Sequence, residues 1–266
     1  AAVTQSGLSF DRQLWLRPEI ISGLREVTGA IHTEGAAAGI QIGHCGNMSH
    51  KKICGTTPIS ASSGFNFYSP TFVRGMKREE LPEMARAYGR AVHLAREAGF
   101  DAVEVHAGHG YLISQFLSPY TNHRKDEYGG SLENRMRFME MVMNEVMTAA
   151  GSDMAVFVKM NMRDGFKGGM ETDETLQVAK RLLALGAHAL VLSGGFVSKA
   201  PMYVMRGAMP IRSMAYYMDC WWLKYGVRMF GKWMIPTVPF REAYFLEDAL
   251  KFRAALPEAP LIYVGG

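Results

Sequence analysis

The sequence predicts an α/β fold of the (β/α)₈ TIM-barrel class, with about five of the eight strands present. Segments with helical and with strand-like hydrophobic patterns alternate along the chain, which is typical of parallel strands joined by right-handed crossovers. Unusual polar residues follow several different strands, and barrel enzymes build their active sites at these strand ends. No G-x-G-x-x-G motif follows a strand, so an open dinucleotide-binding sheet has no support.

The first part of the chain predicts two helices and two strands. Residues 18–34 are expected to be helical because a proline suits their first turn, and a short apolar strand follows at 40–43. Apolar side chains recur every three to four positions over 79–98, which indicates an amphipathic helix that Gly99 ends. Over 101–106 valines alternate with polar side chains, as in a strand with two different faces.

The second part continues this alternation. Ser131 and Thr172 are expected to cap two helices, and Gly186 ends the second of them. A last helix is expected over 242–255. Three more strands are expected over 155–160, 188–193 and 261–264. A closed barrel needs eight strands, so either three strands escape detection or the sequence is an excerpt of a longer protein.

Three connections are too long to be simple turns. Residues 45–75 form a loop rich in Gly, Ser and Thr, 107–130 form a polar loop, and 194–240 are rich in Met and aromatic residues. The last of these is expected either to shape a lid over the substrate or to be a packing insertion.

The composition indicates a folded protein that acts on small molecules. Hydrophobic residues make up 48% and charged residues 20% of the chain, which favours a packed core. The net charge of +4 comes from scattered residues, so neither a nucleic-acid surface nor a membrane span is predicted. No signal peptide is expected at the start of this sequence. Cys45, Cys54 and Cys220 are too few and too far apart for a disulfide framework, so we expect reduced thiols and a cytoplasmic location.

The strand over 101–106 ends at the residues that are the best candidates for catalysis. His106 and His109 lie three positions apart, Tyr111 follows, and Gly108 and Gly110 allow the backbone to bend between them. Two imidazoles can donate hydrogen bonds to one substrate oxygen, and a phenol can deliver a proton. The residue types alone also allow two other interpretations. One is a pair of loop histidines with a packing tyrosine, and the other is a zinc pair in a metal-dependent barrel hydrolase.

The surrounding sequence resembles a known family. The run AGFDAVEVHAGHGYLISQFLSP over 98–119, followed by NHR at 122–124 and DEYGGSLENR at 126–135, is similar to the old yellow enzymes, and closest to the branch with 2,4-dienoyl-CoA reductases and bacterial NADH:flavin oxidoreductases. The resemblance implies a (β/α)₈ barrel with FMN over the carboxyl ends of its strands. It also implies hydride transfer from NAD(P)H, through flavin N5, to the activated C=C bond of an α,β-unsaturated carbonyl compound.

The resemblance assigns cofactor-binding residues position by position. Gln41 matches the glutamine at the flavin pyrimidine edge, and Lys159 matches the basic residue near flavin N1 and O2. A cation there stabilises the negative charge of reduced flavin. Gly265 and Gly266 match the start of the loop whose backbone N–H groups meet the FMN phosphate.

The resemblance also assigns the substrate site. His106 and His109 match the pair that binds the activating oxygen of the substrate, and Tyr111 matches the proton donor. The run 126–135 is expected to be scaffold. The partner is therefore a small-molecule substrate, and the sequence leaves a homo-oligomer open.

The sequence departs from the family in two places. The family reads His-Ala-Gly-Arg after the glutamine strand, whereas this chain reads HCGN over 44–47. The five predicted strands match family strands three to seven, so the domain formed by 1–266 is expected to be incomplete at both ends. An iron–sulfur cluster is not supported by this chain. A non-catalytic, flavin-free fragment therefore stands beside the metal-dependent hydrolase as an alternative.

Overall fold

A computed structural model describes residues 1–66, 70–216, 221–234 and 237–265. Its main feature is a five-stranded parallel sheet in the order β1-β5-β6-β7-β8. The strands are β1 (Gly39–Ile42), β5 (Ala102–His106), β6 (Ala155–Asn161), β7 (Ala189–Ser193) and β8 (Leu261–Tyr263). The five predicted strands and their parallel arrangement are thereby confirmed.

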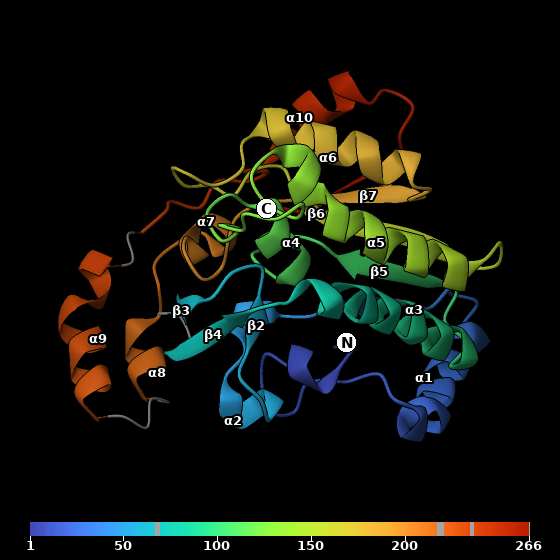
Figure 1. The fold of residues 1–266 in the computed structure, drawn as a ribbon, viewed down its shortest axis with the longest axis horizontal. Coiled ribbons are helices and arrows are strands. Elements are labelled where there is room, and N and C mark those ends of the chain that lie inside the picture. The colour runs from blue at the N-terminus through green and yellow to red at the C-terminus, as the bar shows by residue number, and fades with distance from the viewer. Residues whose placement is uncertain (67–69, 217–220, 235–236, 266) are drawn as a thin grey trace.

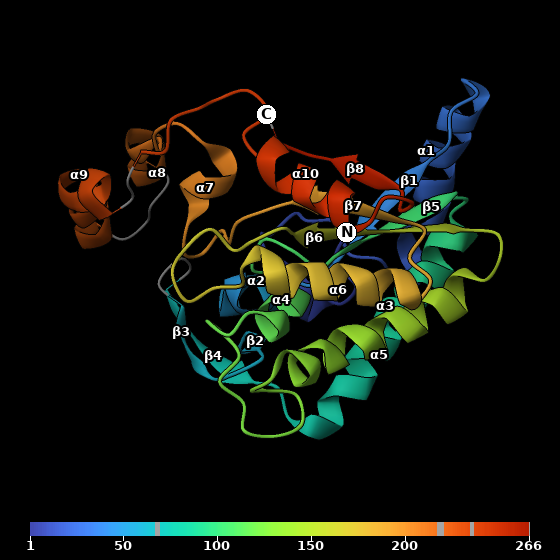
Figure 2. The same ribbon diagram turned by 90° about the horizontal axis from the view of Figure 1, so that it is seen from above.

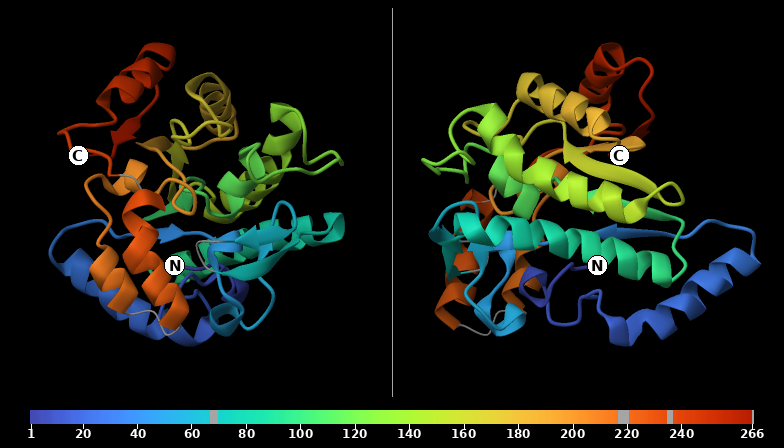
Figure 3. Two further views of the ribbon diagram at one scale, coloured as in Figure 1. Left: turned by 90° about the vertical axis from the view of Figure 1, so that its left-hand side faces the viewer. Right: turned by 45° about the vertical axis from the view of Figure 1, so that its right-hand side comes forward.

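Helices cover the outer face of this sheet. One helix precedes β1 and the others connect successive strands, and together they form an arc around the sheet (Figures 1 and 3). They are α1 (Ile21–Thr33), α3 (Leu81–Glu97), α5 (Leu132–Ala150), α6 (Thr172–Ala184) and α10 (Leu246–Ala255). Beneath them Val103, Val105, Val156 and Val158 have no exposed surface. Burial of each such side chain stabilises the fold by roughly 1.5–3 kcal/mol.

The inner face of the sheet is polar instead. Because side chains alternate along a strand, the register pairs Gln41 with Glu104 and His106 with Lys159 on the face opposite the helices. Neighbouring parallel strands therefore place a row of functional groups side by side. This row ends at the carboxyl end of the sheet, where the long connections begin.

The connection after β1 is more ordered than expected. It contains the short helix α2 (Lys51–Cys54) and a second, three-stranded sheet of β2 (Ile59–Ser60), β3 (Gly64–Asn66) and β4 (Thr71–Gly75). These strands are too short to show a hydrophobic period, so sequence patterns did not predict them.

The other expected loops also contain helices. Helix α4 (Leu112–Leu117) is buried on every side, so it lacks the amphipathic stripe that would have indicated it. The Met-rich connection after β7 forms α7 (Pro201–Met205), α8 (Ile211–Tyr216) and α9 (Trp221–Met234). Helices α8 and α9 lie to one side of the sheet (Figure 2).

The expected helix caps have different outcomes. Ser131 caps α5, because its hydroxyl accepts a hydrogen bond from the Asn134 N–H. The prediction for Thr172 was wrong: Glu171 is the N-cap of α6 and Thr172 is its first helical residue. Among the described helices, none has the length and apolar character that a membrane crossing requires.

Candidate active site

His106 is the last residue of β5 and is 95% buried, with 5% of its surface exposed. Its Nδ1 accepts a hydrogen bond from the Gly108 N–H at 3.3 Å. Burial holds the pKa of His106 well below its usual value, and the nearby His109 and Lys159 act in the same direction. The ring is therefore neutral and carries its proton on Nε2, as a hydrogen-bond donor.

His109 is held by residues of two neighbouring strands, β6 and β7. Its N–H donates to Asn161 Oδ1 at 2.9 Å, and its Nε2 lies 2.7 Å from Ser193 Oγ. Its backbone has a φ of 57°, a left-handed conformation that is uncommon outside glycine. Burial, followed by the charge of Lys159, lowers the pKa of His109 to about 4. Both histidines are therefore neutral near pH 7.

Tyr111 lies directly against the histidine pair. Its ring centroid is 4.4 Å from that of His106, and the two histidine rings are 5.0 Å apart in an edge-to-face arrangement. Gly110 makes this tight turn possible, because it has a φ of 79° and a Cβ there would lie 2.5 Å from the Phe196 ring. The structure thus brings the three predicted substrate-site residues together.

Polar side chains behind this turn hold it in place, and no sequence pattern pointed to them. The Asn161 amide donates to Asp164 Oδ1 at 2.9 Å and to the Gly195 carbonyl at 2.8 Å, while its oxygen holds His109. Burial raises the pKa of the Asp164 carboxyl. The position of Asn161 and Ser193 at strand ends was the only signal that could have indicated them.

The predicted cofactor residues Gln41 and Lys159 lie on the same inner face of the sheet, next to the histidine loop. Lys159 Nζ is 2.8 Å from Glu104 Oε1, and the Gln41 amide donates to the same carboxylate oxygen. The Lys159 and Glu104 side chains are 18% and 20% exposed. No sequence pattern indicated a partner for Lys159, whereas the structure pairs it with Glu104.

The last predicted element is the phosphate loop. Gly265 follows β8 with a φ of 146°, and a Cβ there would lie 2.6 Å from the Phe245 ring. Among the described residues its N–H has no hydrogen-bond partner, while its carbonyl accepts from the Tyr263 hydroxyl. Gly266 lies outside the described residues.

This inner face fits the pyrimidine edge of FMN. Gln41 retains its Oε1 as an acceptor and a second amide hydrogen, and the Lys159 ammonium retains hydrogens beyond the one that faces Glu104. A pyrimidine edge offers one N–H between two carbonyl oxygens, so it needs this mixture of acceptor and donors. In contrast, no group of three His, Cys, Asp or Glu side chains in the described ranges forms a metal site, which leaves the hydrolase alternative without a ligand set there.

The departure at residues 44–47 has a structural explanation. His44 is fully buried between the Ser6 hydroxyl and the Gly46 N–H, and burial lowers its pKa to about 3. Asn47, at the position of the family arginine, accepts a hydrogen bond from Gln115 through its Oδ1 at 2.9 Å. This segment is therefore bound to the histidine loop through Gln115, and the buried Cys45 thiol lies behind it.

Comparisons with known proteins agree with this geometry. Residues 1–219 match the model of the NADH:flavin oxidoreductase / NADH oxidase family. A 4,4'-dithiodibutanoate disulfide reductase of Rhodococcus erythropolis is 38% identical over the whole chain, which covers 66% of that protein. An NADPH dehydrogenase of Bacillus subtilis is 34% identical over 208 residues, which are 78% of this chain and 60% of that protein.

Solved structures share the fold. A 2-naphthoyl-CoA reductase superposes with a TM-score of 0.80 at 24% identity, over 99% of this chain and 37% of that protein. An old yellow enzyme homologue from Zymomonas mobilis superposes with a TM-score of 0.74 at 23% identity, over 100% of this chain and 67% of that protein.

The chain thus spans 66% of the length of one of these curated relatives and less of the other. Its parallel sheet, polar inner face and histidine loop accompany a family match over most of its residues. The chain belongs to the NADH:flavin oxidoreductase family, the family of the old yellow enzymes.

Proposed function

We propose that the protein uses NAD(P)H and FMN to reduce the activated C=C bond of an α,β-unsaturated carbonyl compound. The observation that carries this proposal is the convergence of two neutral histidines and a tyrosine at the end of β5. When bound, FMN accepts hydride from NAD(P)H and passes it on to the substrate. Gln41, Lys159 and the glycine loop after β8 would hold it.

His106 and His109 bind the carbonyl oxygen of the substrate. The Nε2–H of His106 is free to donate because its Nδ1 already accepts from Gly108. His109 can donate from Nδ1 if its Nε2 accepts from the Ser193 hydroxyl, so Ser193 selects the useful tautomer. Two such donors stabilise the negative charge that develops on the oxygen, and one donor of this kind contributes about 3 kcal/mol.

Tyr111 supplies the proton to the α-carbon. Its ring lies beside that of His106, so its hydroxyl belongs to the same face as the oxygen-binding pair. A phenol hydroxyl can deliver its proton to a reacting carbon, as a general acid must. The reaction therefore needs no metal ligand from this loop.

The relatives support a redox reaction over hydrolysis. The two relatives described above are named as a disulfide reductase and an NADPH dehydrogenase. For the present protein we propose a small-molecule substrate and a cytoplasmic location, supported by the free thiols of Cys45 and Cys54. Cys220 lies outside the described residues.

The test is a two-stage anaerobic experiment on the purified protein mixed with FMN. We expect NAD(P)H to bleach the flavin absorbance and a simple enone to restore it, with one saturated ketone formed per flavin. A metal analysis runs in parallel. Hydrolysis that depends on a bound metal, or a protein that binds no FMN, would contradict the proposal.

A further inference from the structure

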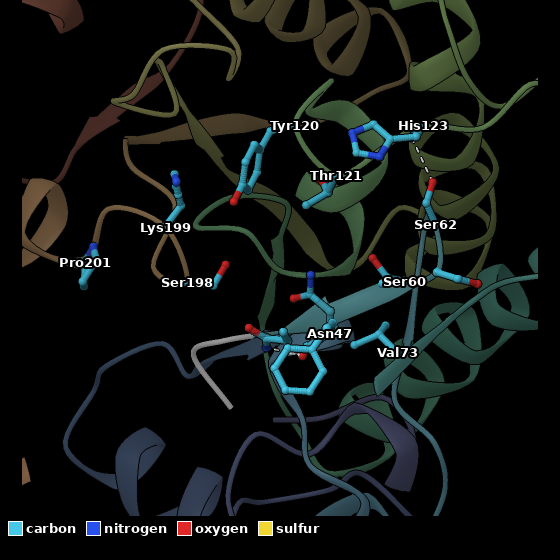
Figure 4. A pocket seen from close by; sticks show the side chains of 14 residues that line it. Asn47, Ser60, Ser62, Val73, Tyr120, Thr121, His123, Ser198, Lys199 and Pro201 are labelled. Atoms are coloured by element: carbon cyan, nitrogen blue, oxygen red, sulfur yellow. Dashed lines mark hydrogen bonds between the residues drawn. The ribbon is translucent and has the colours of Figure 1, made fainter. Parts of the chain in front are cut away.

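A polar cavity of about 570 Å³ lies between the small sheet and the loops that follow β5 and β7. This volume is in the range of small-molecule sites. Figure 4 shows side chains from the three segments pointing into one space. Its lining includes the side chains of Asn47, Ser60, Tyr120, His123 and Lys199.

Lys199 gives this cavity a positive charge. Among the described residues that line it there is no aspartate or glutamate. Lys199 Nζ lies 5.5 Å from the centroid of the Tyr120 ring, and no carboxylate of the described residues forms an ion pair with it. The ammonium is therefore held at the rim by an aromatic face and keeps its hydrogens for a ligand.

Two neutral groups add hydrogen-bonding capacity. Ser60 is 98% buried, and within the described part of the chain its hydroxyl has no hydrogen-bond partner. The Oδ1 of Asn47 is occupied by Gln115, so its amide hydrogens remain available, and Figure 4 shows both side chains directed into the cavity. The Ser60 hydroxyl can therefore donate a hydrogen bond to a bound acceptor.

The cavity is linked to the histidine loop by one side chain. Gln115 Nε2 donates to Asn47 Oδ1 at 2.9 Å and to the Gly110 carbonyl at 2.6 Å. Asn47 belongs to the cavity wall, and Gly110 lies between His109 and Tyr111. The wall of the cavity is therefore only one side chain away from the histidine loop.

We propose that this cavity binds the carboxylate end of an elongated substrate whose reducible bond lies at His106 and His109. The inference rests on the function proposed above and adds the substrate class, an enone that carries a remote carboxylate. A carboxylate only accepts hydrogen bonds, and the Lys199 ammonium, Ser60 hydroxyl and Asn47 amide can all donate. Charge-assisted contacts of this kind are the strong ones.

The test compares a linear enone with a terminal carboxylate and its methyl ester, using Lys199→Met, Ser60→Ala and the control Lys180→Met. Lys180 is exposed on α6, far from the cavity lining. We expect Lys199→Met to raise KM for the acid about ten-fold, which is the loss of one charge-assisted contact, with kcat unchanged. Ser60→Ala should raise it several-fold, whereas neither the ester nor Lys180→Met should show an effect.

Direct binding separates this inference from the proposed function. Calorimetric titration of the FMN-loaded protein with a saturated analogue of the acid needs no turnover, and Lys199→Met should weaken that binding by the same factor. Equal effects on acid and ester would overturn the proposal. So would a rise in KM for NADPH alone, which would assign the cavity to the phosphate of the coenzyme.

Discussion

The histidine loop and the row Gln41–Glu104–Lys159 are neighbours on one inner face, yet they are held in different ways. The loop is fixed by contacts from β6, β7 and α4, including Asn161 and Ser193. The row is carried by three adjacent strands and joined through one carboxylate, that of Glu104.

This difference separates two kinds of function. The loop presents neutral donors in a rigid turn, which suits the binding of one oxygen in one place. The row presents the Lys159 cation beside the Glu104 carboxylate. This pair can adjust the charge that a bound cofactor meets. A change in the loop should therefore affect chemistry, whereas a change in the row should affect how tightly each redox form of the cofactor binds.

The largest effect is expected from removal of both loop histidines. In the double variant His106→Ala and His109→Ala, enone reduction should fall about 10³-fold or more, because two donors of roughly 3 kcal/mol each are lost and their effects are not additive. Flavin reduction by NAD(P)H should fall much less. Stopped-flow measurement of the two half-reactions checks this.

The matched control for this variant is His93→Ala, because His93 is exposed on α3. It should change neither half-reaction. Normal enone reduction in the double variant would show that the histidines do not bind the substrate.

The next largest effect is expected on the pH dependence of the stability of the fold, through His109 of the same loop. His109 has a pKa of about 4 in the fold and about 6.5 when unfolded, so the unfolded chain binds more protons between these values. Stability is therefore complete above pH 6.5 and is lost as the pH falls towards 4, by up to about 2 kcal/mol at pH 5 for this group. His106 and His44 act in the same direction.

Thermal unfolding at pH 7 and pH 5 measures this loss. His109→Asn should reduce the difference between the two pH values, because it removes one of the titrating groups. Enone reduction should show no histidine titration between pH 5 and pH 8. An NMR titration of His109 with a midpoint near 6.5 would contradict the buried, neutral state described here.

The smallest effect is expected from a substitution in the row Gln41–Glu104–Lys159. Glu104→Gln leaves Lys159 without its carboxylate, so its full charge faces the cofactor. The ratio of affinities for reduced over oxidised FMN should rise about ten-fold, the equivalent of one change of 1.4 kcal/mol. Glu133→Gln, an exposed residue of α5, is the control. An unchanged ratio would mean that Glu104 does not limit the charge of Lys159.

Much of the fold and part of the site could be predicted from local patterns. Strand and helix order follows from hydrophobic periodicity, which depends only on near neighbours, and the run around His106, His109 and Tyr111 indicated the candidate substrate site. The helices within the long connections were missed, because α4 is buried all round and has no polar side to contrast with.

The pairings between distant segments were not predictable in the same way. Glu104 looked like one face of an alternating strand, and only the register with β1 and β6 places Gln41 and Lys159 on either side of it. Ser60, Asn47 and Lys199 are polar residues of ordinary type in two separate connections, those after β1 and β7. Nothing local distinguishes them before the chain folds.

The sequence by itself determined the family, the order of the five main strands and of the helices between them, and the residues of the histidine loop, because each of these depends on residues that are close together in the chain. Tertiary structure alone decided which donors remain free, which cation is paired and where a polar cavity opens. The physical reason is that protonation, pairing and burial depend on what lies across the sheet, and the register of parallel strands brings those partners from residues far apart in the chain.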